Sequence, residues 1–314
     1  MSFCSRIKLG LKRLDMFQRR QVEAGAKVNL YLKILDRRED GLHNIESLFV
    51  PVTFPRDVLT LDPLPAGQGL RLSCNWKELE TGNNILARTY ALFGEQTGRW
   101  PSLAVHLEKQ IPMGAGLGGG SSDAAALLKA LFELEDLDFS LEQLVDMARR
   151  IGSDVPFFIS AVPAWVEGAG ERVTPVNVDL DGVGILVIRP DVRISTKEAY
   201  RAWDEASIGH SGRDLTGHQF QLRKSFCSSG RCLMNSFESV VFDLCPEVGN
   251  LKKALLEAGA EGVVLSGSGS ALVAVSRSDQ KLQALIGYCQ KHEIAYSISE
   301  ASSAPNQSWG VAKR

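Results

Sequence analysis

A glycine-rich segment at residues 112–122 is the feature of this sequence most directly tied to chemistry. It reads Pro-Met-Gly-Ala-Gly-Leu-Gly-Gly-Gly-Ser-Ser and leads into an alanine-rich stretch that predicts a helix. Glycines let backbone N–H groups approach an anion without interference from a Cβ atom. The first turn of a helix adds unpaired N–H donors and the positive end of its dipole. The segment therefore predicts a cradle for the phosphates of a polyphosphate ligand.

Two other phosphate-binding loops match parts of this segment. The spacing Gly-x-Gly-x-x-Gly at residues 114–119 fits a dinucleotide fingerprint, with acidic residues about 20 positions further on. That fold needs a buried strand ending at the acidic residue, whereas residues 134–138 lead into a second helix start at Ser140. A Walker A loop needs a lysine after its last glycine, where this sequence has Ser121. A lysine for the phosphates would have to come from elsewhere in the chain.

Asp154, Lys27 and Asn29 are the candidates for acid–base and electrostatic roles. Asp154 follows Gly152-Ser153 at the expected start of a short helix, where a carboxylate can orient an alcohol and accept its proton during phosphoryl transfer. Capping of that helix is the structural alternative. Lys27 beside Asp154 would favour the ionised carboxylate and stabilise charge on the transferred group. Lys27 and Asn29 share one face of an expected strand whose other face is apolar.

The hydrophobic pattern predicts the elements that would position these groups. In the first half, alternating apolar residues predict strands, and apolar residues at helical spacing predict helices. The expected strands are 28–34, 45–54, 57–61, 69–73 and 103–107, and the expected helices are 85–97, the stretch after the glycine segment and 141–150. Asn84 is expected to cap the first of these helices, and Ser140 with Gln143 to form a capping box at the third.

The second half contains the same two kinds of element in a different rhythm. The expected strands are 184–188, 262–265, 272–275 and 295–299, and the expected helices are 196–203, 235–244, 247–258 and 280–291. Residues 204–231 are polar and predict a long loop or a helical insert. Because strands and helices are mixed without strict β–α–β alternation, the fold class is expected to be α+β, with two domains at 21–170 and 171–300.

Composition and charge exclude several classes of function. The chain has 314 residues and a formal net charge of −2, so nothing global points to nucleic acid or a membrane surface. No apolar run reaches the roughly 20 residues of a transmembrane helix. The six cysteines include no Cys-x-x-Cys pair, so neither a zinc site nor a disulfide framework is indicated, and free thiols favour a cytoplasmic location.

The two ends of the chain differ from the rest. Residues 1–20 are rich in Lys and Arg and are expected to be a flexible basic extension, with an organellar targeting segment as the alternative. Residues 301–314 are expected to be a polar tail. The sequence leaves the oligomeric state open between a monomer and a homodimer.

Three motifs resemble one family, and two further segments narrow the resemblance. The glycine segment resembles the ATP loop of the galactokinase, homoserine kinase, mevalonate kinase and phosphomevalonate kinase (GHMP) family, residues 24–32 resemble its first motif, and residues 265–270 resemble its third. Residues 40–44 and 152–157 narrow the resemblance to members that phosphorylate the 2-hydroxyl of a cytidine diphosphate-linked methylerythritol in the non-mevalonate isoprenoid route. It spans roughly residues 22–299 and implies a ribosomal protein S5 domain 2-like N-terminal domain and a ferredoxin-like C-terminal domain.

The resemblance also implies roles for individual residues, with ATP and Mg²⁺ as ligands. Asp154 would be the catalytic base and Lys27 its electrostatic partner, while Asn29 would hold the substrate near its reacting hydroxyl. The residues expected to contact ATP are Asn84, Pro112, Met113, Gly114, Ala115, Gly116, Leu117, Gly118, Gly119, Gly120, Ser121 and Ser122. Ser122 is also the candidate for a magnesium contact, with N-capping as its alternative, and Asp123 is a lesser one.

The cytidine end of the site departs from the family pattern. His43 is expected to hydrogen-bond the cytosine edge, and Tyr200 to lie against the base. Leu42 stands where the family commonly has a stacking aromatic, and a leucine lacks that surface. Ser266, Gly267 and Gly269 are expected to close over the phosphates or the substrate diol. Two other functions stay open: another small-alcohol kinase of the homoserine or mevalonate type, and a catalytically silent nucleotide-binding regulator.

Overall fold

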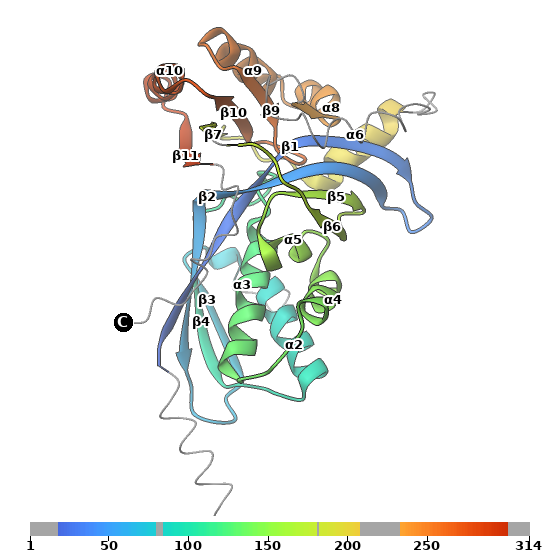
Figure 1. The fold of residues 1–314 in the computed structure, drawn as a ribbon, viewed down its shortest axis with the longest axis vertical. Helices are drawn as coiled ribbons and strands as arrows, with labels where there is room; N and C mark the ends of the chain where they lie inside the picture. Colours follow the sequence, from blue (N-terminus) through green and yellow to red (C-terminus); the bar gives the residue numbers. More distant parts are fainter. Residues whose placement is uncertain (1–17, 80–83, 181, 208–232, 301–314) are drawn as a thin grey trace, which may run out of the picture.

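Two long strands run through the structure and connect its lower and upper halves (Figure 1). The computed structural model describes residues 18–79, 84–180, 182–207 and 233–300. Strand β1 (Arg20–Arg37) pairs antiparallel with β2 (His43–Pro63) and is buried without interruption from residue 26 to residue 32. This buried run includes Lys27 and Asn29, whose polar side chains therefore need partners inside the protein.

The two long strands form the centre of a seven-stranded sheet. The hydrogen-bonded order is β3-β4-β2-β1-β8, and the β5–β6 hairpin is attached to β2. The other strands are β3 (Leu70–Cys74), β4 (Leu103–Glu108), β5 (Ala164–Gly168), β6 (Arg172–Pro175) and β8 (Met234–Asn235). Because β8 comes from the C-terminal half and pairs with β1 in parallel, it joins that half to this sheet.

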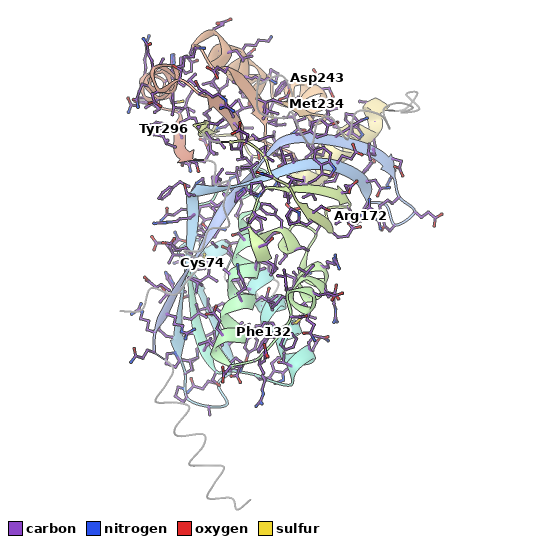
Figure 2. All side chains as sticks on the ribbon, viewed as in Figure 1. Cys74, Phe132, Arg172, Met234, Asp243 and Tyr296 are labelled. Atoms are coloured by element: carbon purple, nitrogen blue, oxygen red, sulfur yellow. The ribbon has the colours of Figure 1, made fainter. Side chains whose placement is uncertain are left out.

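Helices cover one side of the lower part of this sheet (Figure 1). They are α2 (Ile85–Thr97), α3 (Gly119–Leu134), α4 (Leu141–Ile151) and the short α5 (Val155–Ser160), with a 3₁₀ turn, η1 (Lys77–Leu79), before α2. An apolar cluster fills the space between helices and sheet, and it includes Phe93, Phe157 and Phe132, the last labelled in Figure 2. This packing fixes the start of α3, where the glycine segment ends.

The upper half is built on a four-stranded antiparallel sheet. Its strands are β7 (Gly184–Arg189), β9 (Gly262–Leu265), β10 (Leu272–Ser276) and β11 (Ala295–Glu300), in the order β11-β7-β10-β9. Its helices are α6 (Thr196–Ser207), α8 (Glu238–Leu244), α9 (Pro246–Glu257) and α10 (Asp279–Lys291). Numbered within this half, the strand order is 4-1-3-2, as in a ferredoxin-like fold. The prediction of an α+β fold with an N-terminal and a C-terminal domain of the GHMP kinase type is confirmed.

The predicted helix caps are confirmed in detail. Asn84 Oδ1 accepts a hydrogen bond from the backbone N–H of Leu86, and α2 ends at Gly98 with a left-handed φ of 67°. Ser140 and Gln143 form the reciprocal capping box at α4. These local signals depend on residues only a few positions apart, which is why the sequence alone reveals them.

Two predictions about elements are wrong, and one pair of strands is missing from the predictions. Residues 45–54 and 57–61 are one strand, because a register shift opposite Gly25 and Ala26 absorbs residues 53–55 as an irregularity within β2. Asn235 belongs to β8 rather than to a helix, since its amide donates to the carbonyls of Leu265 and Gly267 and the helix begins only at Glu238. The β5–β6 hairpin is not predicted at all. Residues 1–17, 208–231 and 301–314, for which an extension, an insert and a tail are predicted, lie outside the described residues.

Candidate active site

A cleft of about 1380 Å³ lies between the two halves and collects most of the predicted site residues. Ligand pockets for single small molecules span about 300–1,000 Å³, so this volume suits two ligands side by side. The predicted residues that line it are Lys27, Asn29, Leu42, His43, Pro112, Met113, Gly114, Ala115, Gly116, Leu117, Gly118, Gly119, Gly120, Ser121, Asp154, Tyr200 and Gly267. Asn84, Ser122, Ser266 and Gly269 are predicted residues outside this lining.

The glycine segment is held in place through its carbonyl groups. The carbonyls of Ala115, Gly116 and Leu117 accept hydrogen bonds from the backbone of Ala271, the Ser266 hydroxyl and the backbone of Lys27, at 3.3, 3.0 and 3.0 Å. In the described part of the chain, no group accepts a hydrogen bond from the backbone N–H of residues 113–118. Backbone donors near a cleft normally have partners, so these N–H groups are available to an anionic ligand.

Gly116 and Gly118 show why this segment needs glycine. Both have left-handed φ angles, 74° and 72°, which side chains disfavour. A Cβ on Gly116 would lie 1.9 Å from the carbonyl oxygen of Ser266, and one on Gly118 would lie 2.9 Å from the ring of Phe158. The segment therefore rests directly on the Ser266 loop of the C-terminal half, and that loop closes one side of the phosphate cradle.

Lys27, Asn29 and Asp154 form one connected group. The Lys27 Nζ donates to Asn29 Oδ1 at 2.6 Å and lies 3.8 Å from Asp154 Oδ2. Asn29 Nδ2 donates in turn to Ser47 Oγ at 2.8 Å, and the Lys27 ammonium lies 4.4 Å from the centre of the Phe49 ring. Lys27 is thus fixed on three sides, and its charge is directed at the Asp154 carboxylate.

The Lys27–Asp154 pair combines a buried ammonium with a carboxylate that reaches the cleft. Burial lowers the pKa of Lys27, and the negative charge of Asp154 partly opposes that shift. Asp154 occupies the N-cap position of α5 but makes no side-chain capping hydrogen bond. Its side chain is 29% exposed and lines the cleft. Asp154 therefore occupies the capping position, as the alternative expects, but its carboxylate does not bond the helix and can meet a ligand in the cleft.

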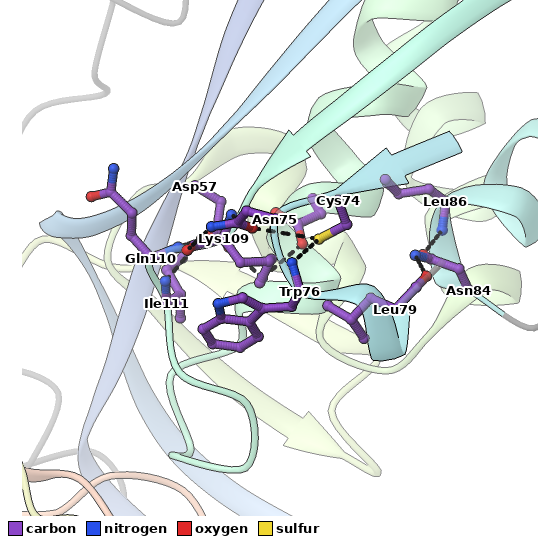
Figure 3. Close-up of polar contacts among 11 residues, drawn as sticks. Asp57, Cys74, Asn75, Trp76, Leu79, Asn84, Leu86, Lys109, Gln110 and Ile111 are labelled. Carbon is purple, nitrogen blue, oxygen red and sulfur yellow. Dashed lines mark hydrogen bonds and ion pairs between the residues drawn. The ribbon is translucent and has the colours of Figure 1, made fainter. Parts of the chain in front are cut away.

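A buried ion triad that the sequence does not reveal lies beneath the start of α3. The Lys109 Nζ donates to Asp57 and, at 2.8 Å, to Asp123 Oδ2 (Figure 3 shows Lys109 and Asp57). Asp57 Oδ1 also accepts from the backbone N–H groups of Gln110 and Ile111 at 2.6 and 2.8 Å. All three side chains are nearly inaccessible. The triad ties β2, the end of β4 and α3 together immediately before the glycine segment.

The electrostatics of this triad are strongly coupled. Burial alone would lower the pKa of Lys109, but the two carboxylates outweigh it and raise the pKa above its usual value. Burial raises the pKa of Asp123 well above its usual range, opposed by Lys109. Lys109 also lines the cleft, below Gly119. Lys109 is therefore a lysine that comes from outside the glycine segment and lies near it. Its ammonium already donates hydrogen bonds to the carboxylates of Asp57 and Asp123.

Two residues that are predicted to contact ATP, Asn84 and Ser122, do not line the cleft. Asn84 uses Oδ1 for the cap of α2 and Nδ2 for the carbonyl of Leu79 at 2.7 Å (Figure 3). The N-cap of α3 is Gly118, so Ser122 does not cap that helix. The Ser122 Oγ is buried with no hydrogen-bond partner in the described structure, whereas Ser121 lines the cleft.

At the other end of the cleft, His43 and Tyr200 contact each other. Their rings stack with centroids 4.8 Å apart, and the rings of Tyr200 and Phe237 form a T-shaped contact. Burial, together with the charge of Asp154, raises the pKa of Tyr200 to about 12. Leu42 is 54% exposed. Asp204 on α6 forms a hydrogen bond with the His43 ring. The sequence alone does not identify Asp204 as a site residue.

The third motif, residues 265–270, lies partly at the cleft and partly in the protein interior. Gly267 and Ser268 line the cleft, and Ser268 Oγ lies 2.9 Å from Thr196 Oγ1. Ser266 is fully buried, and its Oγ accepts from the backbone N–H of Asn29. The Ser270 hydroxyl donates to the Val192 carbonyl. Ser266 thus links β1 to the glycine segment, while the next two residues line the cleft.

Comparisons with known proteins agree with this arrangement. The family pattern "GHMP kinases N terminal domain" matches residues 84–161, and "GHMP kinases C terminal" matches residues 221–294. A 4-diphosphocytidyl-2-C-methyl-D-erythritol kinase from Solidesulfovibrio magneticus is 42% identical over 258 residues, covering 81% of this chain and 87% of that protein. The protein of that name from Lawsonia intracellularis is 38% identical over 285 residues, covering 87% and 93%.

Solved structures share the fold. A 4-(cytidine 5'-diphospho)-2C-methyl-D-erythritol kinase matches with a TM-score of 0.70 and 31% identity, over 89% of this chain and 98% of that one. A homoserine kinase from Cytophaga hutchinsonii has a TM-score of 0.71 over 91% of this chain and 96% of its own, at 20% identity. At that lower identity the match supports the common fold alone.

Proposed function

Because this chain belongs to the GHMP kinases, and among them to the 4-diphosphocytidyl-2-C-methyl-D-erythritol kinases, we propose that it transfers the γ-phosphate of ATP to the 2-hydroxyl of 4-diphosphocytidyl-2-C-methyl-D-erythritol. This phosphorylation is a step of the non-mevalonate route to isoprenoid precursors. One observation carries the proposal: the Lys27–Asp154 pair lies in the same cleft as a loop whose backbone N–H groups have no protein partner in the described structure.

The arrangement supports a mechanism based on orientation and charge. The N–H groups of residues 113–118 and of the first turn of α3 would bind the phosphates of ATP. The substrate hydroxyl would lie against Asp154, which would orient it and accept its proton as the new P–O bond forms. Lys27 would stabilise negative charge on the transferred phosphoryl group. Asn29, bonded to Lys27, would keep the ammonium in position.

Mg²⁺ is proposed as the ion that accompanies ATP. When bound, it would neutralise charge on the β- and γ-phosphate oxygens. No group of three or more His, Cys, Asp or Glu side chains able to hold a metal ion occurs among the described residues. The donors that fit are the hydroxyl groups at the start of α3, where Ser121 lines the cleft and Ser122 Oγ has no hydrogen-bond partner among the described residues. We therefore propose that the nucleotide and water supply most of the ligands.

Partners and location are proposed on narrower grounds. The proposed substrate is a small molecule. A nucleic-acid partner is not proposed, because a net charge of −2 gives no general attraction to a polyanion. Within the described residues, no helix combines the length and apolar character needed to cross a bilayer. In the described part of the chain, Cys245 and Cys289 are thiols and not members of a disulfide, which supports a cytoplasmic location.

An acceptor panel tests the proposed substrate. We expect kcat/KM for the cytidine-linked methylerythritol to exceed that for homoserine and for mevalonate by about 10³-fold or more, because a site built for polar recognition of the base leaves groups unpaired with the smaller alcohols. Release of ADP with each acceptor measures this. Preference for homoserine or mevalonate would instead support the second kinase function, which Leu42 alone favours. Tight ATP binding without transfer to any acceptor would support the regulator.

A further inference from the structure

His43 is held by a carboxylate that no motif in the sequence points to. The His43 Nε2 lies 2.7 Å from Asp204 Oδ1, and the His43 side chain is 6% exposed. Asp204 lies on α6, one turn after Tyr200, whose ring stacks on the imidazole at an interplanar angle of 17°. The same helix therefore fixes both the plane of the His43 ring and the direction of one of its nitrogens.

The second oxygen of Asp204 has its own partner. Asp204 Oδ2 lies 3.5 Å from Arg37 Nη1, at the end of β1. In the described part of the chain, Asp204 pairs with His43 and Arg37 and with no other side chain. The carboxylate is thereby kept in one orientation, with Oδ1 toward the imidazole.

This contact decides which ring nitrogen of a neutral His43 carries the hydrogen. An ionised carboxylate can only accept a hydrogen bond, so Nε2 must donate. In the neutral imidazole the other nitrogen, Nδ1, then has a lone pair and is an acceptor. No described residue is hydrogen-bonded to Nδ1, and His43 lines the cleft. Nδ1 is the nitrogen that remains for a ligand.

An acceptor at this position distinguishes two pyrimidine bases. Cytosine carries a 4-amino group, which donates, whereas a 4-oxo group, as in uracil, only accepts. An Nδ1 lone pair that faces the 4-position would accept a hydrogen bond from the amino group of cytosine. Opposite uracil, it would face the carbonyl oxygen, so that two acceptors would meet without a hydrogen between them. Hydrogen bonding that fits one partner and leaves the other unpaired is an effective source of specificity.

We propose that Asp204 is a positioning residue for base recognition: it holds His43 in the tautomer whose Nδ1 accepts a hydrogen bond from the 4-amino group of cytosine, so that the site selects cytidine-linked over uridine-linked substrates. This inference rests on the proposed function, which brings the cytosine to His43. The chemistry of the His43–Asp204 contact does not depend on it.

The tautomer is measured directly by nitrogen-15 NMR of the histidine rings. The chain has five histidines, and the signals lost in His43→Gln identify those of His43. We expect the ring hydrogen on Nε2 in the unmodified protein and a mixture of tautomers in Asp204→Asn, because an asparagine amide can either accept from Nε2 or donate to it. A hydrogen on Nδ1 in the unmodified protein overturns the inference whatever the activity.

The substrate preference is measured as the ratio of kcat/KM for the cytidine-linked substrate to that for its uridine-linked analogue. We expect Asp204→Asn to lower this ratio by about tenfold, the effect of one hydrogen-bonding group left unpaired, and to change KM more than kcat. Glu198→Gln, on the same helix but outside the cleft lining, is the control and should leave the ratio unchanged.

The possible outcomes distinguish a failure of the role of Asp204 from a failure of the proposed function. If the unmodified protein phosphorylates the cytidine-linked substrate and Asp204→Asn keeps the full ratio, the inference about Asp204 is wrong and the proposed function stands. If the unmodified protein phosphorylates neither nucleotide-linked alcohol, the proposed function is wrong. A lower ratio together with the tautomer change supports both.

Discussion

Asp154→Asn is expected to lower kcat by about 10²–10⁴-fold, the range for removing a positioned general base. Asparagine keeps the size and the hydrogen-bonding oxygen of the side chain but cannot take up the proton of the substrate hydroxyl. ATP binding should persist, because the N–H groups of residues 113–118 are unchanged. Steady-state ADP release at saturating substrate, with nucleotide affinity measured by calorimetry, checks both parts.

The control for this prediction is Asp146→Asn. Asp146 is exposed on α4 and pairs only with its neighbour Arg149, among the described residues, so its removal should leave kcat unchanged. An Asp154→Asn variant with full turnover and normal ATP affinity would contradict the role of Asp154 as the base. Loss of ATP binding in that variant would instead indicate that Asp154 supports the nucleotide.

Lys109→Met is expected to lower the free energy of unfolding by about 3–5 kcal/mol, because it leaves the carboxylates of Asp57 and Asp123 buried without their shared cation. Methionine retains most of the side-chain volume, so the loss is electrostatic. The variant should also weaken ATP binding, since Asp57 holds the backbone just before the glycine segment. Urea unfolding monitored by circular dichroism measures the stability change.

A surface lysine provides the comparison for Lys109. Lys281 pairs with Glu261 at 3.3 Å, but its side chain is 50% exposed, so Lys281→Met should change the unfolding free energy by no more than about 0.5 kcal/mol. Similar small effects from both variants would contradict the idea that the triad is a structural support of the cleft.

The parts of the site that sequence could predict are those defined by neighbouring residues. The glycine segment specifies its own conformation, and Lys27 and Asn29 appear as polar residues on a buried strand. The Asn84 cap and the capping box of Ser140 and Gln143 likewise depend on short spacings. In each case the physical requirement, a left-handed φ or an unpaired N–H, is met within a few residues of the chain.

The parts that sequence could not predict depend on contacts between distant segments. Asp57 and Lys109 are 52 residues apart, and each looks like an ordinary charged residue at a strand end. His43 and Asp204 are 161 residues apart. Asp123 shows the same limit: from the sequence it is only a lesser candidate for a magnesium contact, whereas the fold buries it beside Lys109. Only the register of β2 against β4 and the placement of α6 bring these groups together.

The position of the new phosphate in the product tests the central claim most directly. Carbon 2 of the methylerythritol carries a methyl group and no hydrogen, so a phosphate on its hydroxyl has no carbinol proton three bonds away. We predict that phosphorus-31 NMR of the reaction with ATP shows one new phosphomonoester signal that is not split by protons. A signal split by carbinol protons, which marks transfer to the 1- or 3-hydroxyl, or the absence of any new monoester, would contradict the account.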